Sequence, residues 1–515
     1  MDHTTSSPLL LQRLAQWAAA QRKSCRVPFL ASLVFGFLAY GFTFTNKLVN
    51  HDEVFSLFIK GATVDSGRWG LGALDSIFPN ISMPWIYGIF TIVFLALAVC
   101  LMTRIFRVEN RLLQVLFAGC VLVFPSLTGT FGYMFTSCSF ALSFLSATVA
   151  VWLMQEKGIW RFLFALGFMV FSLSIYQSYI ALAAGLLVLM LIHRLLHGED
   201  TVSLIRSGVL YVVFLILSLG LYYGATQVIL KLLHVEMNGY ASGNLGFSLA
   251  AIPANILESY RSFFRYFTEG FRGLFPTALS RGLHMTFLVI SLVLLVLWAL
   301  ARKEKKAGRL LLLAALVGIL PLALNCMYLF TVPDSIHTLV LYGMVGIYAF
   351  AVIVSDACLS LVHPRPLGTV LLNILTVCLS AILLLNIYIA NAASLNLYLR
   401  YENAYSFYTA LAADIRQMPE FDENTTIAVI GTWQEPSFYE EKFPFLTELT
   451  GVKGFLPDSY SRAKFLEFYI GLPIPSASEE EMAAITATAE FAQMPAYPYY
   501  GSAKFFGDTL VVKLS

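Results

Sequence analysis

Long apolar runs separated by short polar segments dominate this sequence. A transmembrane helix needs about 20 mostly apolar residues to cross roughly 30 Å of hydrocarbon, and it satisfies its backbone hydrogen bonds internally. The chain is 58% hydrophobic and only 12% charged, which excludes an ordinary soluble domain. We therefore predict an all-α polytopic membrane protein with about eleven transmembrane helices. The predicted spans are residues 28–45, 84–103, 112–126, 135–154, 162–176, 179–192, 207–232, 285–301, 310–330, 338–355 and 367–390.

Lysine and arginine collect in every second loop between these spans, as at Arg104, Arg107 and Arg111 after the second span. Short basic loops stay in the cytoplasm during insertion, so the pattern predicts a cytoplasmic N-terminus and an outer C-terminus. The first apolar run is too long for a signal-peptide core, which predicts a retained anchor. The predicted divisions are a cytoplasmic segment 1–27, a membrane domain 28–390 with outer loops 46–83 and 233–284, and an extracytoplasmic domain 391–515.

Several classes of function are not supported by the sequence. The seven cysteines lie within or beside apolar runs, which predicts neither a disulfide framework nor a zinc site. The net charge of +2 is explained by topology, so it gives no indication of nucleic-acid binding. The sequence contains no Walker motif and no nucleophile elbow. We therefore expect no nucleotide hydrolysis, no bound cofactor and no metal.

Two adjacent carboxylates open the first outer loop. Asp52 and Glu53 follow Asn50 at the start of a predicted short amphipathic helix that reaches Lys60. One interpretation is structural, because Asn50 can cap the helix and the helix dipole favours acidic residues in the first turn. The other is catalytic, because a carboxylate where a membrane-borne substrate meets water can accept the proton of a sugar hydroxyl. The two roles are compatible.

Arginines in the outer segments are candidates for holding a lipid-linked substrate. Arg261, Arg265 and Arg272 are spaced to share one narrow face of a predicted helix over residues 255–272. They either anchor the protein to anionic headgroups or hold a donor phosphate, which arginine binds bidentately. Arg400, just past the last span, either snorkels to the interface or reaches the same phosphate.

Smaller constellations also have two interpretations. Asp334 and His337 either form a solvated turn after Pro333 or complete a site. Tyr176 and Gln177 belong either to an interfacial aromatic belt or to a sugar-binding surface.

Two histidines, His193 and His197, have the i, i+4 spacing of a metal-binding pair. They lie on the predicted cytoplasmic side, beside Arg194 and Glu199. We therefore do not predict a metal there.

The tail combines helical and strand patterns. It begins with a predicted helix from Leu397 to about Met418, followed by a strand over Thr426–Ile430. A helical run near 462–469, a helix after the Ser476–Glu479 start signal and a terminal strand over 509–513 complete the pattern. The tail is therefore predicted to form a small α/β domain packed on the outer face.

The chain resembles the bacterial Gtr-type serotype-converting glucosyltransferases, membrane enzymes of the GT-C class. The resemblance covers most of the length, including the architecture. It rests on the order of short motifs, which are Asp52-Glu53, Ser66-Gly67-Arg68-Trp69, Arg400-Tyr401-Glu402-Asn403 and the ending from Met494-Pro495 to Asp508-Thr509-Leu510-Val511-Val512-Lys513-Leu514.

The resemblance implies a multi-pass enzyme of the bacterial inner membrane. It would transfer glucose or a related hexose from a polyprenyl-phosphate donor to a surface polysaccharide such as O-antigen, on the periplasmic side. A donor synthase and a flippase are implied as possible partners. In such enzymes a carboxylate of the first outer loop is the base, which corresponds here to Asp52 or Glu53.

We expect a single inverting displacement at the anomeric carbon, with positive charge where the lipid phosphate departs. Trp69 is either a stacking platform for the sugar or a membrane-interface anchor. The predicted site comprises Asp52 or Glu53 as base, Arg68, Arg261, Arg265 and Arg400 at the donor phosphate, and Trp69, Tyr176, Gln177, Asp334, His337 and Tyr401 at the sugar or acceptor.

Two other functions stay open on the sequence alone. A transporter or flippase of lipid-linked glycan would place functional charges near the middle of the bilayer. A glycan polymerase or ligase would use similar outer arginines but transfer a preassembled oligosaccharide. Only the identity of the donor separates a polymerase or ligase from an enzyme that transfers a single hexose.

Overall fold

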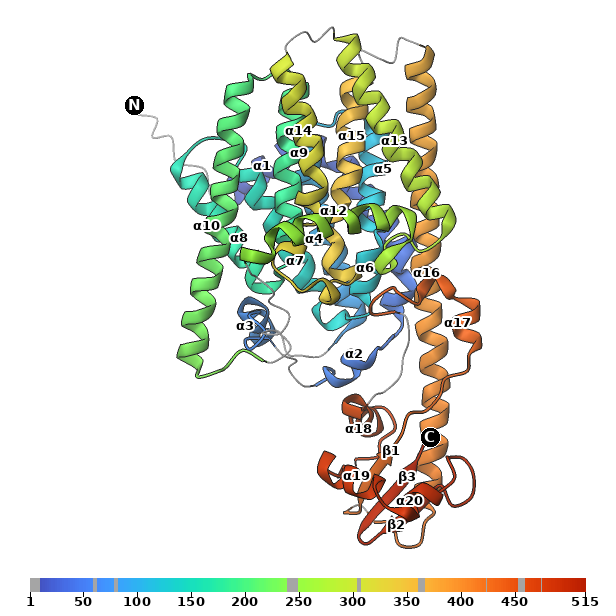
Figure 1. Cartoon of the computed structure of the whole chain (residues 1–515). Helices are drawn as coiled ribbons and strands as arrows, with labels where there is room; N and C mark the ends of the chain where they lie inside the picture. Colours follow the sequence, from blue (N-terminus) through green and yellow to red (C-terminus); the bar gives the residue numbers. More distant parts are fainter. Residues whose placement is uncertain are drawn as a thin grey trace, which may run out of the picture.

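The computed structural model describes residues 10–58, 63–77, 82–238, 249–302, 307–359, 366–422, 424–452, 459–473 and 475–515. Figure 1 shows a bundle of long helices with a small domain beneath it. Within the described residues, nine helices are long and apolar enough to cross a membrane, and a bent helix pair makes a tenth if it is one span. The prediction of an all-α polytopic membrane protein is confirmed.

Each predicted span corresponds to a helix or a helix pair. The spanning helices are α1 (Leu10–Thr45), α4 (Pro84–Ile105), α7 (Met134–Leu153), α9 (Tyr179–Leu196), α10 (Thr201–Leu233), α13 (Ala278–Ala301), α14 (Ala307–Leu324), α15 (Gly346–Leu359) with the preceding η5 (Thr338–Val345), and α16 (Pro366–Arg416). The shorter apolar helix α8 (Ile159–Ile175) fills the place of the fifth predicted span.

The third predicted span, residues 112–126, is broken in the structure. α5 (Arg111–Leu122) and α6 (Pro125–Phe131) meet at a bend of 44°. Pro125 explains the break, because proline lacks a backbone N–H and disfavours helical geometry in the residue before it.

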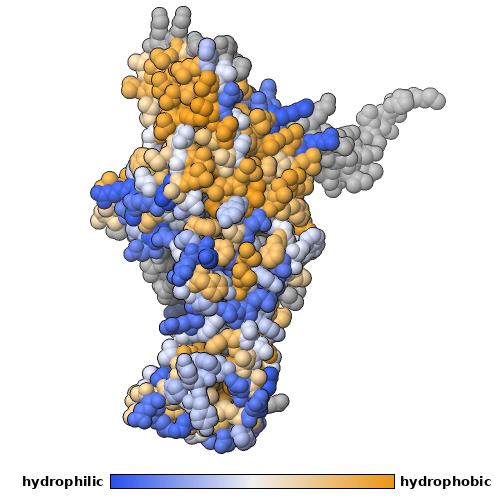
Figure 2. Space-filling view, turned by 90° about the vertical axis from the view of Figure 1, so that its right-hand side faces the viewer, coloured by the Kyte–Doolittle hydropathy of each residue, from blue (hydrophilic) through white to orange (hydrophobic). Residues whose placement is uncertain are grey.

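The spans differ in how far the bundle covers them. The apolar window of η5 and α15 is 100% buried and that of α9 is 89% buried, whereas that of α10 is only 22% buried. α10 exposes large apolar side chains such as Ile216 and Leu221. Figure 2 shows an apolar zone over the upper part of the molecule and a hydrophilic lower part. The apolar zone is therefore the surface that faces lipid.

The two ends of the bundle carry different loops. The domain end holds α2 (His51–Phe55), α3 (Trp69–Ile77), η4 (Pro333–Ser335) and the C-terminal domain (Figure 1). The basic end holds the loops 106–110, 154–158 and 197–200. α12 (Ile252–Thr268) lies across the bundle instead of along it (Figure 1). It buries Phe263, Tyr266 and Phe267 against the bundle, as its amphipathic pattern requires.

The last helix joins the bundle to the C-terminal domain. α16 is continuous over 51 residues, which corresponds to about 76 Å at 1.5 Å per residue. Hydrocarbon accounts for only about 30 Å of that length. The helix predicted from Leu397 to Met418 is therefore the outer part of α16, which ends at Arg416.

A three-stranded sheet forms the core of the C-terminal domain. β1 (Thr426–Ile430) pairs in parallel with β3 (Thr509–Lys513), which also pairs antiparallel with β2 (Ala503–Phe506). The two predicted strands are confirmed, and the predicted helices correspond to α18 (Ser459–Phe468) and α19 (Glu479–Thr486). A capping box between Ser478 and Glu481 begins α19. The sequence did not predict β2, α17 (Phe438–Lys442), η6 (Pro444–Leu446) or α20 (Ala489–Gln493).

A buried ion pair fixes the segment after β1 to α16. Arg400 pairs with Glu435, and their side chains are only 6% and 8% exposed. The Arg400 Nε also donates to Asn396 Oδ1 at 3.0 Å, and its guanidinium lies 5.0 Å from the centre of the Tyr439 ring. Removing one partner of a buried pair leaves the other charge without compensation, which costs about 3–5 kcal/mol.

We expect Arg400→Met to loosen the C-terminal domain. The change should lower the free energy of unfolding by about 3–5 kcal/mol, because the Glu435 carboxylate loses its cation while it stays buried. Thermal melting and limited proteolysis of the purified protein would measure this. The double variant Arg400→Met with Glu435→Met should recover most of the loss, and wild-type stability of the single variant would contradict the role of this pair.

Candidate functional site

The predicted cap of the first-loop helix is confirmed. α2 covers His51–Phe55, and the Glu53 backbone N–H donates to Asn50 Oδ1 at 2.9 Å. The predicted continuation of this helix is wrong up to Phe58, because α2 ends at Phe55 and residues 56–58 form a turn. Its predicted end at Lys60 lies outside the described residues. The cap fixes the first turn, so the two carboxylates that follow Asn50 point in different directions.

Glu53 is fully buried and both of its carboxylate oxygens are engaged. Lys47 pairs with Oε1, and the Ser82 hydroxyl donates to the same oxygen. The Phe135 backbone N–H donates to Oε2 at 3.2 Å. Phe135 lies in the first turn of α7, where the helix dipole favours negative charge. Glu53 is thus held in a fixed position between the first loop and α7.

Asp52 has a different environment. Its side chain is 42% exposed, and His51 Nε2 lies 3.8 Å from its Oδ2. The two neighbouring carboxylates therefore differ sharply in access, because Glu53 is enclosed whereas Asp52 reaches solvent at the domain end.

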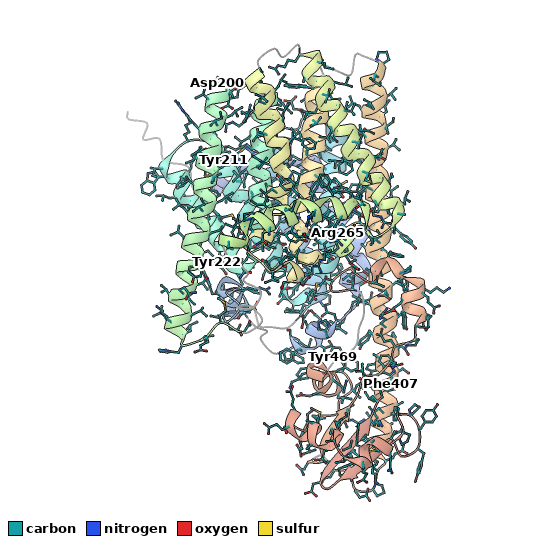
Figure 3. The ribbon with its side chains drawn as sticks, viewed as in Figure 1. Asp200, Tyr211, Tyr222, Arg265, Phe407 and Tyr469 are labelled. Atoms are coloured by element: carbon teal, nitrogen blue, oxygen red, sulfur yellow. The ribbon has the colours of Figure 1, made fainter. Side chains whose placement is uncertain are left out.

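The C-terminal domain contributes a tyrosine to this region. α18 packs against α2, and Figure 3 shows Tyr469, which follows α18, just below α2. Burial, together with the nearby Glu53 carboxylate, raises the pKa of Tyr469 above its ordinary value. Its hydroxyl is buried and has no hydrogen-bond partner within the described residues. Tyr401, one of the predicted site residues, packs against Tyr469 with ring centres 6.0 Å apart.

The loop from Ser66 to Arg68 is clamped by two side chains. Gln177 Nε2 donates to the Ser66 carbonyl oxygen at 3.2 Å, and the Tyr222 hydroxyl donates to the Gly67 carbonyl oxygen at 3.0 Å. Gly67 has φ +75°, and a Cβ there would lie 2.7 Å from the Tyr222 hydroxyl. Only glycine meets both conditions. The clamp places the Arg68 guanidinium 5.4 Å from the centre of the Tyr176 ring.

Arg272 does not share a helical face with Arg261 and Arg265. α12 ends at Thr268, and the chain then takes positive φ angles at Gly270 (+70°) and Arg272 (+59°). That part of the prediction is wrong, because the backbone turns away after the helix. Arg272 instead donates to the Pro333 carbonyl oxygen at 3.0 Å, and it lies 3.6 Å from the exposed Asp334 carboxylate.

Arg68, Arg272 and His337 converge at the domain end. Burial, and then the charges of Arg68 and Arg272, lower the pKa of His337 from 6.5 to about 4. The Nε atoms of both arginines and Nδ1 of His337 are buried, and none has a hydrogen-bond partner among the residues that the structure describes. Buried polar nitrogens normally have partners. Two guanidinium groups and one imidazole with such nitrogens are suited to an anion.

The other predicted site residues lie elsewhere. Arg261 is exposed on α12, and Arg265 forms an ion pair with Glu269 at 2.8 Å. Arg400 is enclosed with Glu435, as described above. The Trp69 indole N–H donates to Thr226 Oγ1 at 3.2 Å, which ties α3 to α10.

α7 connects the region of the two carboxylates to the cluster of Arg68, Arg272 and His337. Phe135 binds Glu53 at the start of this helix. Phe140, about 7.5 Å further along the axis, stacks on Tyr176 with ring centres 4.3 Å apart. The Arg68 guanidinium in turn lies over the Tyr176 ring. The two groups of polar side chains thus share one scaffold at the membrane edge.

His337 gives a pH-dependent contribution to stability. Unfolded histidine binds a proton near pH 6.5, whereas folded His337 does so only near pH 4. Acidification through this window therefore favours the unfolded state, and above pH 6.5 the stabilising effect is fully present. When the pH is lowered from 6.5 to about 4, we expect the melting temperature of wild type to fall further than that of His337→Gln. Parallel melting curves for the two proteins would contradict this assignment.

The family of the chain was identified by comparison with known proteins. A family model described as Glucosyl transferase GtrII matches residues 41–353. No curated protein and no solved structure gave a match. The matched region includes the first-loop carboxylates, the Arg68 loop, Arg272 and His337, and it extends over more than half of the chain. The chain therefore belongs to the GtrII glucosyltransferase family.

Proposed function

We propose that this glucosyltransferase transfers glucose from a polyprenyl-phosphate donor to a surface polysaccharide such as O-antigen. The observation that carries the choice of donor is the convergence of Arg68, Arg272 and His337, whose buried nitrogens lack partners among the described residues. A lipid phosphate at the membrane edge would supply the missing acceptors. Family membership supports the glucosyl group.

The same three side chains would stabilise the departing phosphate. Negative charge develops on the leaving group as the glycosidic bond breaks, and preorganised donors lower the free energy of that transition state. We propose Arg68, Arg272 and His337 for this role in place of Arg261, Arg265 and Arg400. Arg261 is exposed, Arg265 is paired with Glu269 at 2.8 Å, and Arg400 is buried with Glu435. Arg272 has only the solvent-exposed Asp334 carboxylate nearby, at 3.6 Å, which favours the narrower set.

We propose Asp52 as the base. In an inverting displacement the acceptor hydroxyl attacks the anomeric carbon from the side opposite the phosphate, and its proton passes to a carboxylate. The exposed Asp52 side chain can meet an acceptor from solvent, whereas the Glu53 oxygens are occupied by Lys47, Ser82 and Phe135. Glu53 would fix the position of α2 and so of Asp52.

The distribution of charge supports a periplasmic reaction. At the basic end, Arg104, Arg107 and Arg111 lie in and beside the loop after α4, and Arg194 and Arg206 flank the loop after α9. Arginines in such positions mark the cytoplasmic side in the positive-inside rule. The domain end would then face the periplasm, with the C-terminal domain and the proposed site on the same side.

The two carboxylates should respond differently to substitution. Asp52→Asn should reduce glucose transfer by about 10²–10⁴-fold while melting temperature stays unchanged, because the side chain is exposed. Glu53→Gln should instead lower stability, because Lys47 loses its buried counter-ion. Mass spectrometry of the surface polysaccharide, in a deletion strain with matched membrane levels, measures transfer.

Each alternative outcome has a meaning. Normal transfer by Asp52→Asn together with loss in a stably folded Glu53→Gln would make Glu53 the base. Unchanged glycan in both variants would reduce the pair to a helix cap. Loss of an oligosaccharide block, instead of one hexose per repeat, would identify a polymerase or ligase.

The phosphate assignment predicts a change in donor use. Arg68→Gln and Arg272→Gln should each raise the KM for the polyprenyl-phosphate donor by roughly tenfold or more, because each removes a charge-assisted hydrogen-bond donor. Arg261→Gln is the matched comparison on the exposed face of α12, and it should leave this KM unchanged. An effect of Arg261→Gln equal to that of Arg272→Gln would return the assignment to the α12 face.

A further inference from the structure

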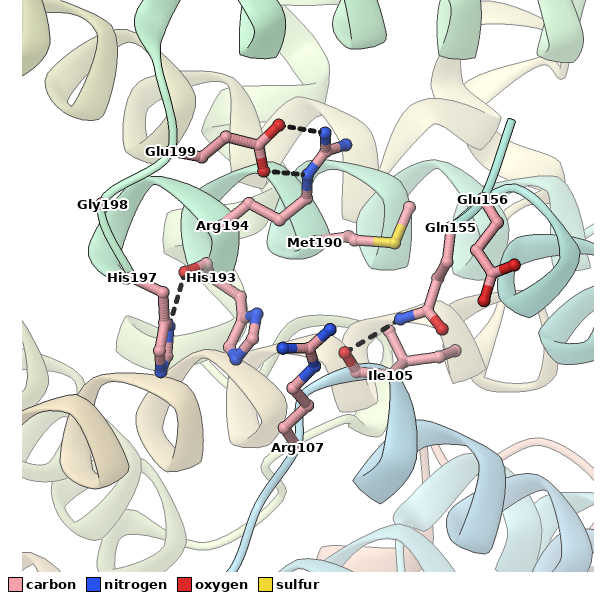
Figure 4. Close-up of a pocket in the computed structure, with 10 residues that line it drawn as sticks. All are labelled: Ile105, Arg107, Gln155, Glu156, Met190, His193, Arg194, His197, Gly198 and Glu199. Carbon is pink, nitrogen blue, oxygen red and sulfur yellow. Dashed lines mark hydrogen bonds and ion pairs between the residues drawn. The ribbon is translucent and has the colours of Figure 1, made fainter.

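A polar cavity lies at the basic end of the bundle, at the opposite end of the spanning helices from the proposed catalytic site. Its volume is about 530 Å³, and the ends of α4, α7 and α9 and the loops after them enclose it. Figure 4 shows Arg107, His193 and His197 on one side of this cavity, with Glu199 and Arg194 above. Ile105 and Met190 add apolar surface to the lining.

The charges of the cavity do not cancel fully. Arg194 holds Glu199 by two hydrogen bonds, which lower the pKa of the Glu199 carboxyl. The other acidic side chain, Glu156, pairs with Arg161. Arg107 has no ion pair with a carboxylate among the described residues. The lining therefore keeps one guanidinium charge that is not neutralised locally.

The two histidines also present nitrogen atoms suited to a ligand. His197 Nδ1 lies 2.8 Å from the His193 carbonyl oxygen. A carbonyl can only accept, so Nδ1 carries a proton and Nε2 is the remaining nitrogen. His193 is only 6% exposed, and its Nε2 is buried without a hydrogen-bond partner within the described ranges. Its ring lies beside Arg107 in Figure 4.

These side chains favour an anion over a metal ion. The described residues bring no third histidine, cysteine or carboxylate into a metal-binding arrangement with this pair. A guanidinium beside a buried imidazole is unfavourable for a cation, whereas an anion gains a charge-assisted hydrogen bond from each group. The imidazole would take up a proton when the anion binds.

We infer that this cavity binds a phosphate group, held by Arg107 and the Nε2 atom of His193. The apolar walls at Ile105 and Met190, together with the exposed Arg107 at the end of the spanning helices, suit the headgroup of an anionic phospholipid. Free phosphate is also an anion with phosphoryl oxygen acceptors. The two sources therefore need separate arms in the test.

The test uses the full-length protein in nanodiscs. Wild type in phosphatidylcholine should gain melting temperature when phosphatidylglycerol is included, and native mass spectrometry should detect retained phosphatidylglycerol. Arg107→Gln should weaken this retention by roughly tenfold, because a charge-assisted contact is lost. Arg107 is exposed, so the substitution should not prevent folding. His193→Gln should have the same effect, and Arg206→Gln on the exposed surface of α10 is the matched control.

The outcomes separate the sources of phosphate. A gain with inorganic phosphate in phosphatidylcholine nanodiscs, lost in Arg107→Gln, would support the site with a soluble ligand. A gain only with phosphatidylglycerol, lost in the same variant, would support the lipid. Equal retention by wild type, Arg107→Gln and Arg206→Gln would overturn the inference, as would melting temperatures that respond to neither phosphate source.

Discussion

The ion pair and hydrogen bonds of the enclosed Glu53 carboxylate are the interactions on which the domain end of this protein depends. A charge in a buried place is tolerated only when ion pairs and hydrogen bonds replace water. Lys47 from the end of the first span, Ser82 before α4 and the Phe135 N–H at the start of α7 supply them. One carboxylate therefore ties the loop around residues 47–53 to the segment before α4 and to the start of α7. Electrostatic interactions thus contribute to the position of this loop.

The arrangement assigns different tasks to neighbouring side chains. Glu53 is immobilised, and the adjacent Asp52 is left accessible on the same short helix. Phe140 of α7 stacks on Tyr176, and the Arg68 guanidinium lies over the Tyr176 ring. Because both groups use one rigid helix as support, α7 fixes their positions relative to one another.

The sequence predicted the membrane architecture well because apolar runs about 20 residues long have few alternatives. The Asn50 cap was also predictable, since capping is a local interaction. Arg272 was placed on the wrong surface, because helical spacing was extended through Gly270, where the backbone adopts positive φ. The pairing of Arg400 with Glu435 and the approach of Tyr469 to Glu53 depend on tertiary contacts. No local pattern encodes such contacts.

The unbroken α16 has a mechanical consequence. Beyond residue 390 it continues for about 39 Å at 1.5 Å per residue, and no loop interrupts it before Arg416. The C-terminal sheet is thus attached to the bundle by a continuous helix. The number of helical residues sets its distance from the membrane-spanning part. Inserting or deleting helical turns there would change the distance between the C-terminal sheet and the bundle by steps of about 5.4 Å.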